Sequence, residues 1–155
     1  MANTYSQIYI HIVFSVQGRQ NLIPKDKKEE LHQYMTGIIR NKEQKLLAIN
    51  CMPDHVHLFI STKPDIALSN LVRDIKNNSS KFINERNWVR GKFRWQKGFG
   101  AFSYGSSQVN TVIKYIQHQE KSHTRITFQA EYLELLKKFN VEYDARYLFD
   151  GIDGY

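Results

Sequence analysis

The sequence contains a single cysteine, Cys51, among its 155 residues. One cysteine cannot form an internal disulfide, which excludes the class of small secreted proteins that are held together by such bonds. A reducing compartment is the natural setting for this composition, and we expect a cytoplasmic protein. Because 41% of the residues are apolar, one domain of 18.3 kDa can form a hydrophobic core without cross-links.

Long apolar segments and nucleotide-binding loops are also missing. No window approaches the roughly 20 apolar residues needed to cross a bilayer, so we expect no membrane association. The chain also lacks a basic region before its first apolar stretch, as a signal peptide would have. The patterns GxxxxGK(S/T), GxGxxG, GxSxG and HExxH are absent as well. Nothing in the sequence therefore suggests chemistry that depends on ATP or NAD.

Positive charge is in excess and is concentrated in one part of the chain. The 22 Lys and Arg residues exceed the 15 Asp and Glu residues, for a net charge of +7. Between Arg73 and Lys97, eight basic residues stand against two acidic ones. From Gln129 onwards the balance reverses to −3. A polyanionic partner therefore fits the middle of the chain better than its acidic C-terminal tail.

The hydrophobic periodicity predicts eight regular elements. Alternating apolar residues predict strands near residues 5–17, 45–51, 55–62 and 99–104. Apolar positions that recur every three or four residues predict helices near residues 25–41, 66–85, 107–122 and 130–139. The first six elements follow the order βαββαβ, which is typical of an α+β, ferredoxin-like (RRM-like) sandwich.

In such a sandwich, one antiparallel sheet carries its helices on one face, and we expect the other face to be open. The helices after the fourth strand are then additions to this core. We expect a single domain over residues 1–155, with a core over about residues 5–122 and a C-terminal helix and acidic tail over about residues 125–155.

Two histidines lie two residues apart on the third predicted strand. Residues i and i+2 of a strand point to the same face, so His55 and His57 leave the core together. By alternation along the first strand, His11 is a candidate for the same face. Two neutral imidazoles can bind one divalent cation, with a carboxylate or carboxamide from elsewhere completing the site. The alternative is a pair of surface histidines on a half-exposed strand.

A tyrosine and a glutamine lie one turn apart on the helix predicted near residues 107–122. Tyr115 and Gln119 flank the apolar stripe of this helix, and Gln108 lies near them. A tyrosine in this place can act as a nucleophile, and the glutamine oxygen can bind a metal ion. The alternative is a boundary tyrosine that only makes a hydrogen bond.

Aromatic and basic residues interleave ahead of the fourth predicted strand. Cations bind phosphates and rings stack on unpaired bases, so this stretch predicts binding of single-stranded nucleic acid. The aromatic residues are Trp88, Phe93, Trp95 and Phe99. The candidate DNA-binding residues are Arg73, Lys76, Arg90, Lys92, Arg94, Trp95 and Lys97. The alternative is an ordinary solvated helix face.

Three motifs occur in order along the chain: Pro53-Asp54-His55-Val56-His57-Leu58, Trp95-Gln96-Lys97-Gly98-Phe99 and Tyr115-Ile116-Gln117-His118-Gln119. In this order, and joined to the βαββαβ pattern, they resemble the motifs of the single-tyrosine HUH transposases of the insertion-sequence 200/605 family. The resemblance covers about residues 5–122.

The resemblance implies a DNA transposase that cleaves and rejoins single-stranded DNA through a 5′-phosphotyrosine intermediate. His55 and His57 match the metal-ligand pair, Tyr115 matches the nucleophile, and Gln119 matches a polar residue that helps to hold the metal. The implied cofactor is a divalent metal, Mg²⁺ or Mn²⁺. We treat His11 and Asp54 as candidates for residues that support the metal ligands.

The resemblance also implies partners. Members bind DNA hairpins near the ends of the element, and they form homodimers. The helix that carries the nucleophile can come from the other subunit, so we expect composite active sites.

Two other functions stay open at this point. A non-catalytic module that binds single-stranded RNA or DNA on an RRM-like sheet would account for the basic and aromatic stretch. A domesticated relative that processes repetitive hairpins without moving an element would have the same site as a transposase.

Overall fold

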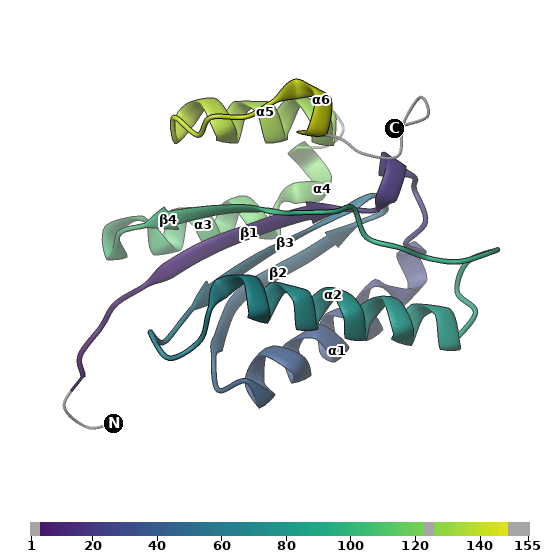
Figure 1. The fold of residues 1–155 in the computed structure, drawn as a ribbon, viewed down its shortest axis with the longest axis horizontal. Coiled ribbons are helices and arrows are strands. Elements are labelled where there is room, and N and C mark those ends of the chain that lie inside the picture. The colour runs from purple at the N-terminus through teal and green to yellow at the C-terminus, as the bar shows by residue number, and fades with distance from the viewer. Residues whose placement is uncertain (1–3, 123–125, 149–155) are drawn as a thin grey trace.

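Four strands form one antiparallel sheet in the order β2-β3-β1-β4 in the computed structural model, which describes residues 4–122 and 126–148 (Figure 1). The strands are β1 (Tyr9–Ser15), β2 (Lys45–Met52), β3 (His55–Ser61) and β4 (Gly100–Tyr104). The helices are α1 (Lys28–Asn41), α2 (Leu68–Glu85), α3 (Val109–Gln117), α4 (Gln119–Ser122), α5 (Phe128–Lys138) and α6 (Ala145–Leu148). Three short 3-10 turns are η1 (Gln17–Arg19), η2 (Lys25–Lys27) and η3 (Ser106–Gln108). None of the helices described combines the length and apolar character of a membrane span.

The element order confirms the predicted ferredoxin-like α+β fold. The chain runs β1, α1, β2, β3, α2, β4, and β1 lies in the sheet between β3 and β4. Helices α1 and α2 cover one face of the sheet, below it in Figure 1. The core between them is formed by the inward-facing side of each strand and the apolar stripes of both helices. Its fully buried members include Ile12, Phe14, Leu31, Met35, Leu58, Leu71 and Ile75.

The expectation that the second face of the sheet is open is wrong. Helices α3 and α5 lie against it, on the side opposite α1 and α2 (Figure 1). The physical reason is that this face also carries large apolar side chains, among them Val13, Phe59 and Phe102, which need cover from water. The apolar stripes of α3 and α5 provide that cover through Val112, Ile116, Phe128, Tyr132, Leu135 and Leu136.

The helix predicted near residues 107–122 is interrupted. Backbone torsions of φ −101° and ψ 21° at His118 end α3, and α4 starts at Gln119. The side-chain amide of Asn50 on β2 donates a hydrogen bond to the carbonyl of Ile116 at 2.8 Å, in the last turn of α3. After this break the Gln119 side chain is fully buried over the sheet.

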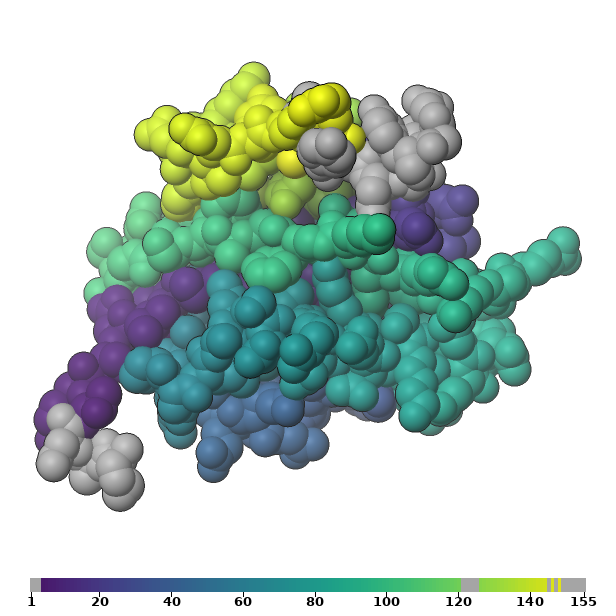
Figure 2. Space-filling model, viewed as in Figure 1, coloured from purple at the N-terminus to yellow at the C-terminus, as the bar shows by residue number. Residues whose placement is uncertain are grey.

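The connection between α2 and β4 extends outward at one end of the molecule (Figures 1 and 2). The expectation that Trp95 stacks on bases is wrong, because this side chain is only 8% exposed. Its ring packs edge-on against Phe14 and Phe93, each with a centroid distance of 4.8 Å. The Trp95 indole also donates a hydrogen bond to the Ser79 hydroxyl at 2.9 Å. Phe93 and Trp95 therefore anchor this connection to the core instead of facing solvent.

The predicted DNA-binding basic residues of α2 and of the connection divide into two groups. The half-buried amine of Lys76 donates hydrogen bonds to the backbone carbonyls of Gln96, at 2.9 Å, and Gly98. It thereby ties α2 to the segment that leads into β4. The other predicted basic residues, which are Arg73, Arg90, Lys92, Arg94 and Lys97, are exposed.

The C-terminal helix predicted near residues 130–139 is α5. Its first turn is capped by Thr127, whose hydroxyl accepts a hydrogen bond from the backbone N–H of Ala130 at 3.2 Å. The predicted acidic tail continues past Leu148, and that part lies outside the described residues.

Candidate active site

His55 and His57 point from β3 to the face covered by α3 and α5. In the sheet, His57 pairs with Val13 of β1 and with Asn50 of β2, while His55 pairs with Ser15 and Met52. Both imidazoles are 0% exposed. The alternative of two surface histidines is therefore excluded, and the predicted shared orientation is confirmed.

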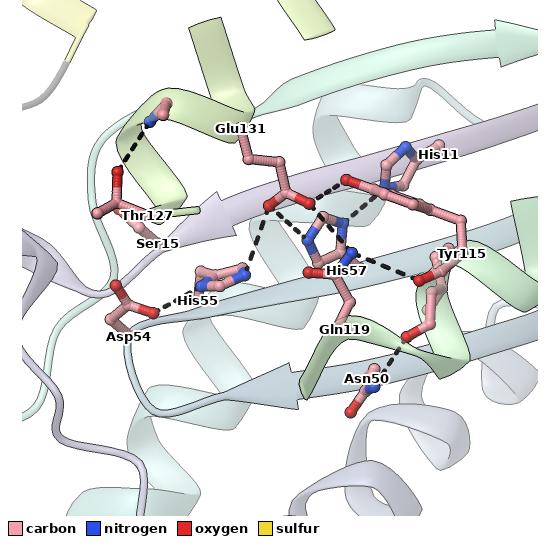
Figure 3. Close-up of polar contacts among 12 residues, drawn as sticks. His11, Ser15, Asn50, Asp54, His55, His57, Tyr115, Gln119, Thr127 and Glu131 are labelled. Atoms are coloured by element: carbon pink, nitrogen blue, oxygen red, sulfur yellow. Dashed lines mark hydrogen bonds and ion pairs between the residues drawn. The ribbon is translucent and has the colours of Figure 1, made fainter. Parts of the chain in front are cut away.

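One nitrogen of each imidazole is held by a neighbouring side chain. The Nδ1 of His55 lies 2.6 Å from Oδ1 of Asp54, and the Nδ1 of His57 lies 2.7 Å from Nε2 of His11 (Figure 3). Burial, followed by the neighbouring His57, lowers the pKa of His11 well below its usual value. These contacts leave the Nε2 atoms of His55 and His57 facing the same space under α5.

A carboxylate that the sequence analysis did not select lies in that space. Oε1 of Glu131, on α5, is 3.2 Å from Nε2 of His57 and 3.7 Å from Nε2 of His55 (Figure 3). The Glu131 side chain is buried, and one ligand atom from each of these residues lies within 4.8 Å of the others. The three side chains together therefore form a group with the spacing of a metal site.

The position of Glu131 in the sequence could have indicated a functional role. It follows Phe128 by three residues and precedes Leu135 by four, and both of those side chains are buried. Glu131 thus occupies the apolar stripe of α5, where a carboxylate is rare unless it has a specific partner. The sequence could not reveal the partner, since His57 is 74 residues away.

Tyr115 lies beside the same group. Its hydroxyl donates a hydrogen bond to Oε2 of Glu131, and its ring packs edge-on against His57 with a centroid distance of 5.8 Å. Burial, together with the negative charge of Glu131, raises the pKa of Tyr115 far above its usual value, so the phenol is protonated at neutral pH. The histidines and the tyrosine come together within one chain.

Gln119 completes the cluster. Its side-chain N–H donates to Oε2 of Glu131 at 3.0 Å. Its Oε1 is buried and has no hydrogen-bond partner in the part of the chain that the structure describes. A buried carboxamide oxygen without a donor is an atom that a cation could bind.

A pocket of about 270 Å³ opens beside Tyr115 between α3 and α5. The residues that line it include Tyr104, Gln108, Tyr115, Glu131 and Lys138. The predicted proximity of Gln108 to Tyr115 is thus confirmed at this pocket. The cluster therefore combines nitrogen and oxygen donors suited to a divalent cation with a phenol and an adjoining space for a reactant.

Comparison with known proteins shows which family the chain belongs to. The family model described as "Transposase IS200 like" matches residues 4–119. The chain belongs to this family of IS200-like transposases. The family resemblance identified from the sequence motifs is thus confirmed. The matched segment contains His55, His57, Tyr115 and Gln119, and it ends before Glu131.

Individual IS200-like transposases are similar over most of the chain. The transposase for insertion sequence element IS200 of Salmonella typhimurium is 23% identical over 124 residues, which cover 77% of this chain and 81% of that protein. The ISDra2 transposase TnpA of Deinococcus radiodurans is 22% identical over 120 residues, which cover 73% of this chain and 84% of that protein. A REP-associated tyrosine transposase, solved bound to a REP hairpin, has a TM-score of 0.61 at 15% identity, over 79% of this chain and 73% of that one. This last similarity shows that the two proteins share a fold.

Proposed function

We propose that this IS200-like transposase cleaves and rejoins single-stranded DNA at the ends of an insertion sequence, with Tyr115 as the nucleophile. The observation that carries the proposal is the single buried cluster that joins the Tyr115 hydroxyl, the two strand imidazoles and Gln119. Family membership supports DNA as the substrate.

The proposed cofactor is Mg²⁺ or Mn²⁺, held by His55, His57 and Gln119. The fit rests on two convergent Nε2 atoms and on the buried Oε1 of Gln119, which has no hydrogen-bond partner among the described residues. When bound, the ion would supply Lewis-acid stabilisation to the scissile phosphate. Asp54 and His11 would hold the two imidazoles in orientation through their Nδ1 atoms.

The proposed reaction exchanges one phosphate ester for another. The Tyr115 oxygen attacks the phosphorus atom, the bond from phosphorus to the 3′ oxygen breaks, and the products are a 5′-phosphotyrosine link and a free 3′-OH. The phenol gives up its proton and the leaving 3′ oxygen gains one. Because the ester is not hydrolysed, a later attack by a 3′-OH can rejoin the DNA without ATP. This agrees with the absence of a nucleotide-binding loop from the sequence.

The proposed DNA-binding surface is the exposed basic part of the connection between α2 and β4. Arg90, Lys92, Arg94 and Lys97 lie there, and Arg73 is an exposed residue of α2. Exposed cations bind the phosphate backbone, so hairpins as well as single strands suit this surface. A REP-associated tyrosine transposase with the same fold has been solved bound to a REP hairpin, which supports a DNA hairpin as a partner of this chain. Lys76 would act indirectly, since it holds the backbone of this segment.

The proposal includes the organisation of the protein. We expect one domain over residues 1–155, acting in the cytoplasm as a homodimer. Tyr115 lies beside His57 of the same chain, and exchange of α3 between the two subunits would form the expected composite active sites from the same residues.

The test is formation of a covalent adduct. Single-stranded oligonucleotides that tile the DNA flanking the gene are labelled at the 3′ end and incubated with protein and Mg²⁺ or Mn²⁺. We expect an SDS-stable labelled adduct, which disappears in Tyr115→Phe and persists in Tyr104→Phe, a matched change in the same pocket. The same oligonucleotides labelled at the 5′ end should give no labelled adduct.

Other outcomes would reject the proposal. An undiminished adduct with Tyr115→Phe would remove Tyr115 as the nucleophile. Binding of single strands that resists EDTA and the His57→Ala change, without any adduct, would instead identify a non-catalytic nucleic-acid-binding module.

A further inference from the structure

We propose that Glu131 is an additional ligand of the metal ion, so that α5 forms part of the metal centre. The inference rests on the proposed function, since the ion is the one assigned above to His55, His57 and Gln119. It goes beyond that assignment because Glu131 lies past residue 119, where the match to the family ends.

The distances between the ligand atoms support this role. Two ligands that each lie about 2.1 Å from an ion, at right angles, are about 3 Å apart. Oε1 of Glu131 lies 3.2 Å from Nε2 of His57 and 3.7 Å from Nε2 of His55. Small movements of the side chains would therefore bring all three atoms to bonding distance of one ion.

The chemistry of the set supports the same role. Two imidazoles and one carboxylate, with open positions left for other ligands, are an established donor set for divalent transition metals. The site is buried, with Glu131 only 4% exposed, and buried carboxylates are found paired or bound to metal ions. One carboxylate leaves a divalent ion with net positive charge, which a phosphate can then approach.

The second carboxylate oxygen gives Glu131 a link to the proposed nucleophile. Oε2 accepts hydrogen bonds from the Tyr115 hydroxyl and from Gln119. Glu131 would therefore bind the ion through one oxygen and hold the phenol next to the ion through the other. Figure 3 shows the Glu131 carboxylate between the imidazole pair and Tyr115.

Helix α5 is packed so that Glu131 stays in this position. The Phe128 ring stacks on the His55 imidazole, with a centroid distance of 4.5 Å, and Tyr132 lies against Gly100 of β4. These contacts on either side of Glu131 orient the carboxylate toward β3. Metal binding should in turn strengthen the attachment of α5 to the sheet.

The experiment measures Mn²⁺ binding without DNA. Free Mn²⁺ is followed by electron paramagnetic resonance during titration of the wild-type chain and of the variants Glu131→Gln, Glu134→Gln and His57→Ala. Glu134 lies on the same helix and is exposed, so it is the matched control. We expect Glu131→Gln to weaken Mn²⁺ binding at least about tenfold, and Glu134→Gln to leave the affinity unchanged.

Two results would overturn the inference. Unchanged Mn²⁺ affinity in Glu131→Gln would show that the carboxylate does not bind the ion, and tighter binding would show that it obstructs the site. If His57→Ala weakens binding in either case, the proposed metal site survives and only the role of Glu131 fails. If the wild-type chain does not bind Mn²⁺, or if every variant binds it as tightly as the wild type does, the result counts against the proposed function itself.

A second measurement uses only the wild-type chain, so it can be made even if the variants fail to fold. Hydrogen exchange with and without Mn²⁺ should show greater protection of the backbone amides of α5 (Phe128–Lys138) when the ion is present. Protection confined to β3, with α5 unchanged, would contradict ligation by Glu131.

Discussion

Residues behind the candidate site determine where its functional groups point. Asn50 is such a residue, because its amide donates to the Ile116 carbonyl while the side chain itself is buried. Carbonyl groups in the last turn of a helix have no regular helical donor. Asn50 therefore connects β2 to the turn of α3 that immediately follows Tyr115.

We expect Asn50→Ala to lower the free energy of unfolding by about 1–3 kcal/mol, because a buried carbonyl loses its donor. The rate of adduct formation should fall as well, since α3 is less firmly placed. Urea denaturation and the covalent-adduct assay measure the two effects, with the exposed Asn77→Ala as the control. A loss of stability no larger than that of the control would contradict this role.

His32 links stability to pH at the opposite face of the sheet. Its Nε2 accepts a hydrogen bond from the backbone N–H of Cys51 at 2.9 Å, which requires the neutral imidazole. Partial burial is the main cause that lowers the pKa of His32 below 6.5. The unfolded chain therefore takes up a proton at a higher pH than the folded chain, and acid favours unfolding.

The contribution of His32 to stability should be complete above about pH 6.5 and lost as the pH falls through its folded pKa. In His32→Gln, the side-chain oxygen can accept the same hydrogen bond without titrating. Urea denaturation between pH 7.5 and 5 should show a smaller loss of stability in this variant than in the wild type. Equal pH dependence in the two proteins would rule out His32 as the cause.

At the scale of elements, the contact between β4 and α5 controls how the site is covered. A Cβ atom at Gly100 would lie 2.5 Å from Cε1 of Tyr132 and 3.2 Å from Phe102. Glycine therefore allows α5 to approach the sheet closely enough for Glu131 to reach the histidines. The helix that carries the carboxylate and the strand that accommodates it depend on each other.

We expect Gly100→Ala to displace α5 and to destabilise the protein by about 1–3 kcal/mol through overpacking. Hydrogen exchange should show faster exchange of the α5 amides. Gly105→Ala is the control, since a Cβ atom there has nothing within 4 Å and the backbone φ of −83° suits alanine. If the α5 amides exchange at the same rate in both variants, the close contact at Gly100 does not hold α5 in place.

On the scale of the whole molecule, the basic connection and the buried cluster meet at one end of the sheet. The Gln96 side chain accepts a hydrogen bond from the backbone of Ser15 at 2.5 Å, and Ser15 pairs with His55. Gln96, which follows Arg94 by two residues, is thus joined to the end of β1 that lies beside His55. If this surface binds DNA as proposed, we expect the bound DNA strand to lead toward the end of the sheet where His55 lies.

We expect the affinity for single-stranded DNA to fall with log salt at about 0.7 per phosphate neutralised. Replacement of Arg90, Lys92 and Arg94 by Gln should reduce that slope. A triple change of the exposed Arg40, Lys45 and Lys63 should not, because β2 begins at Lys45 and pairs there with the far end of β3. An unchanged slope in the first variant would place the DNA-binding surface elsewhere.

The sequence by itself determined the elements and the direction of the main side chains. Period-two alternation placed His55, His57 and His11 on one face, and helical spacing placed Tyr115 and Gln119 one turn apart. These properties depend on neighbours within a few residues, so they can be read from local patterns. The three motifs, taken in order, then identified the family.

The tertiary structure alone decided what covers that face. Burial of the histidines by α3 and α5, the placement of Trp95 in the core and the position of Glu131 beside His57 all come from contacts between distant segments. Periodicity shows that a helix has an apolar stripe, but it does not show which surface the stripe covers. That pairing depends on shape and on the total apolar area removed from water, which only the assembled chain defines.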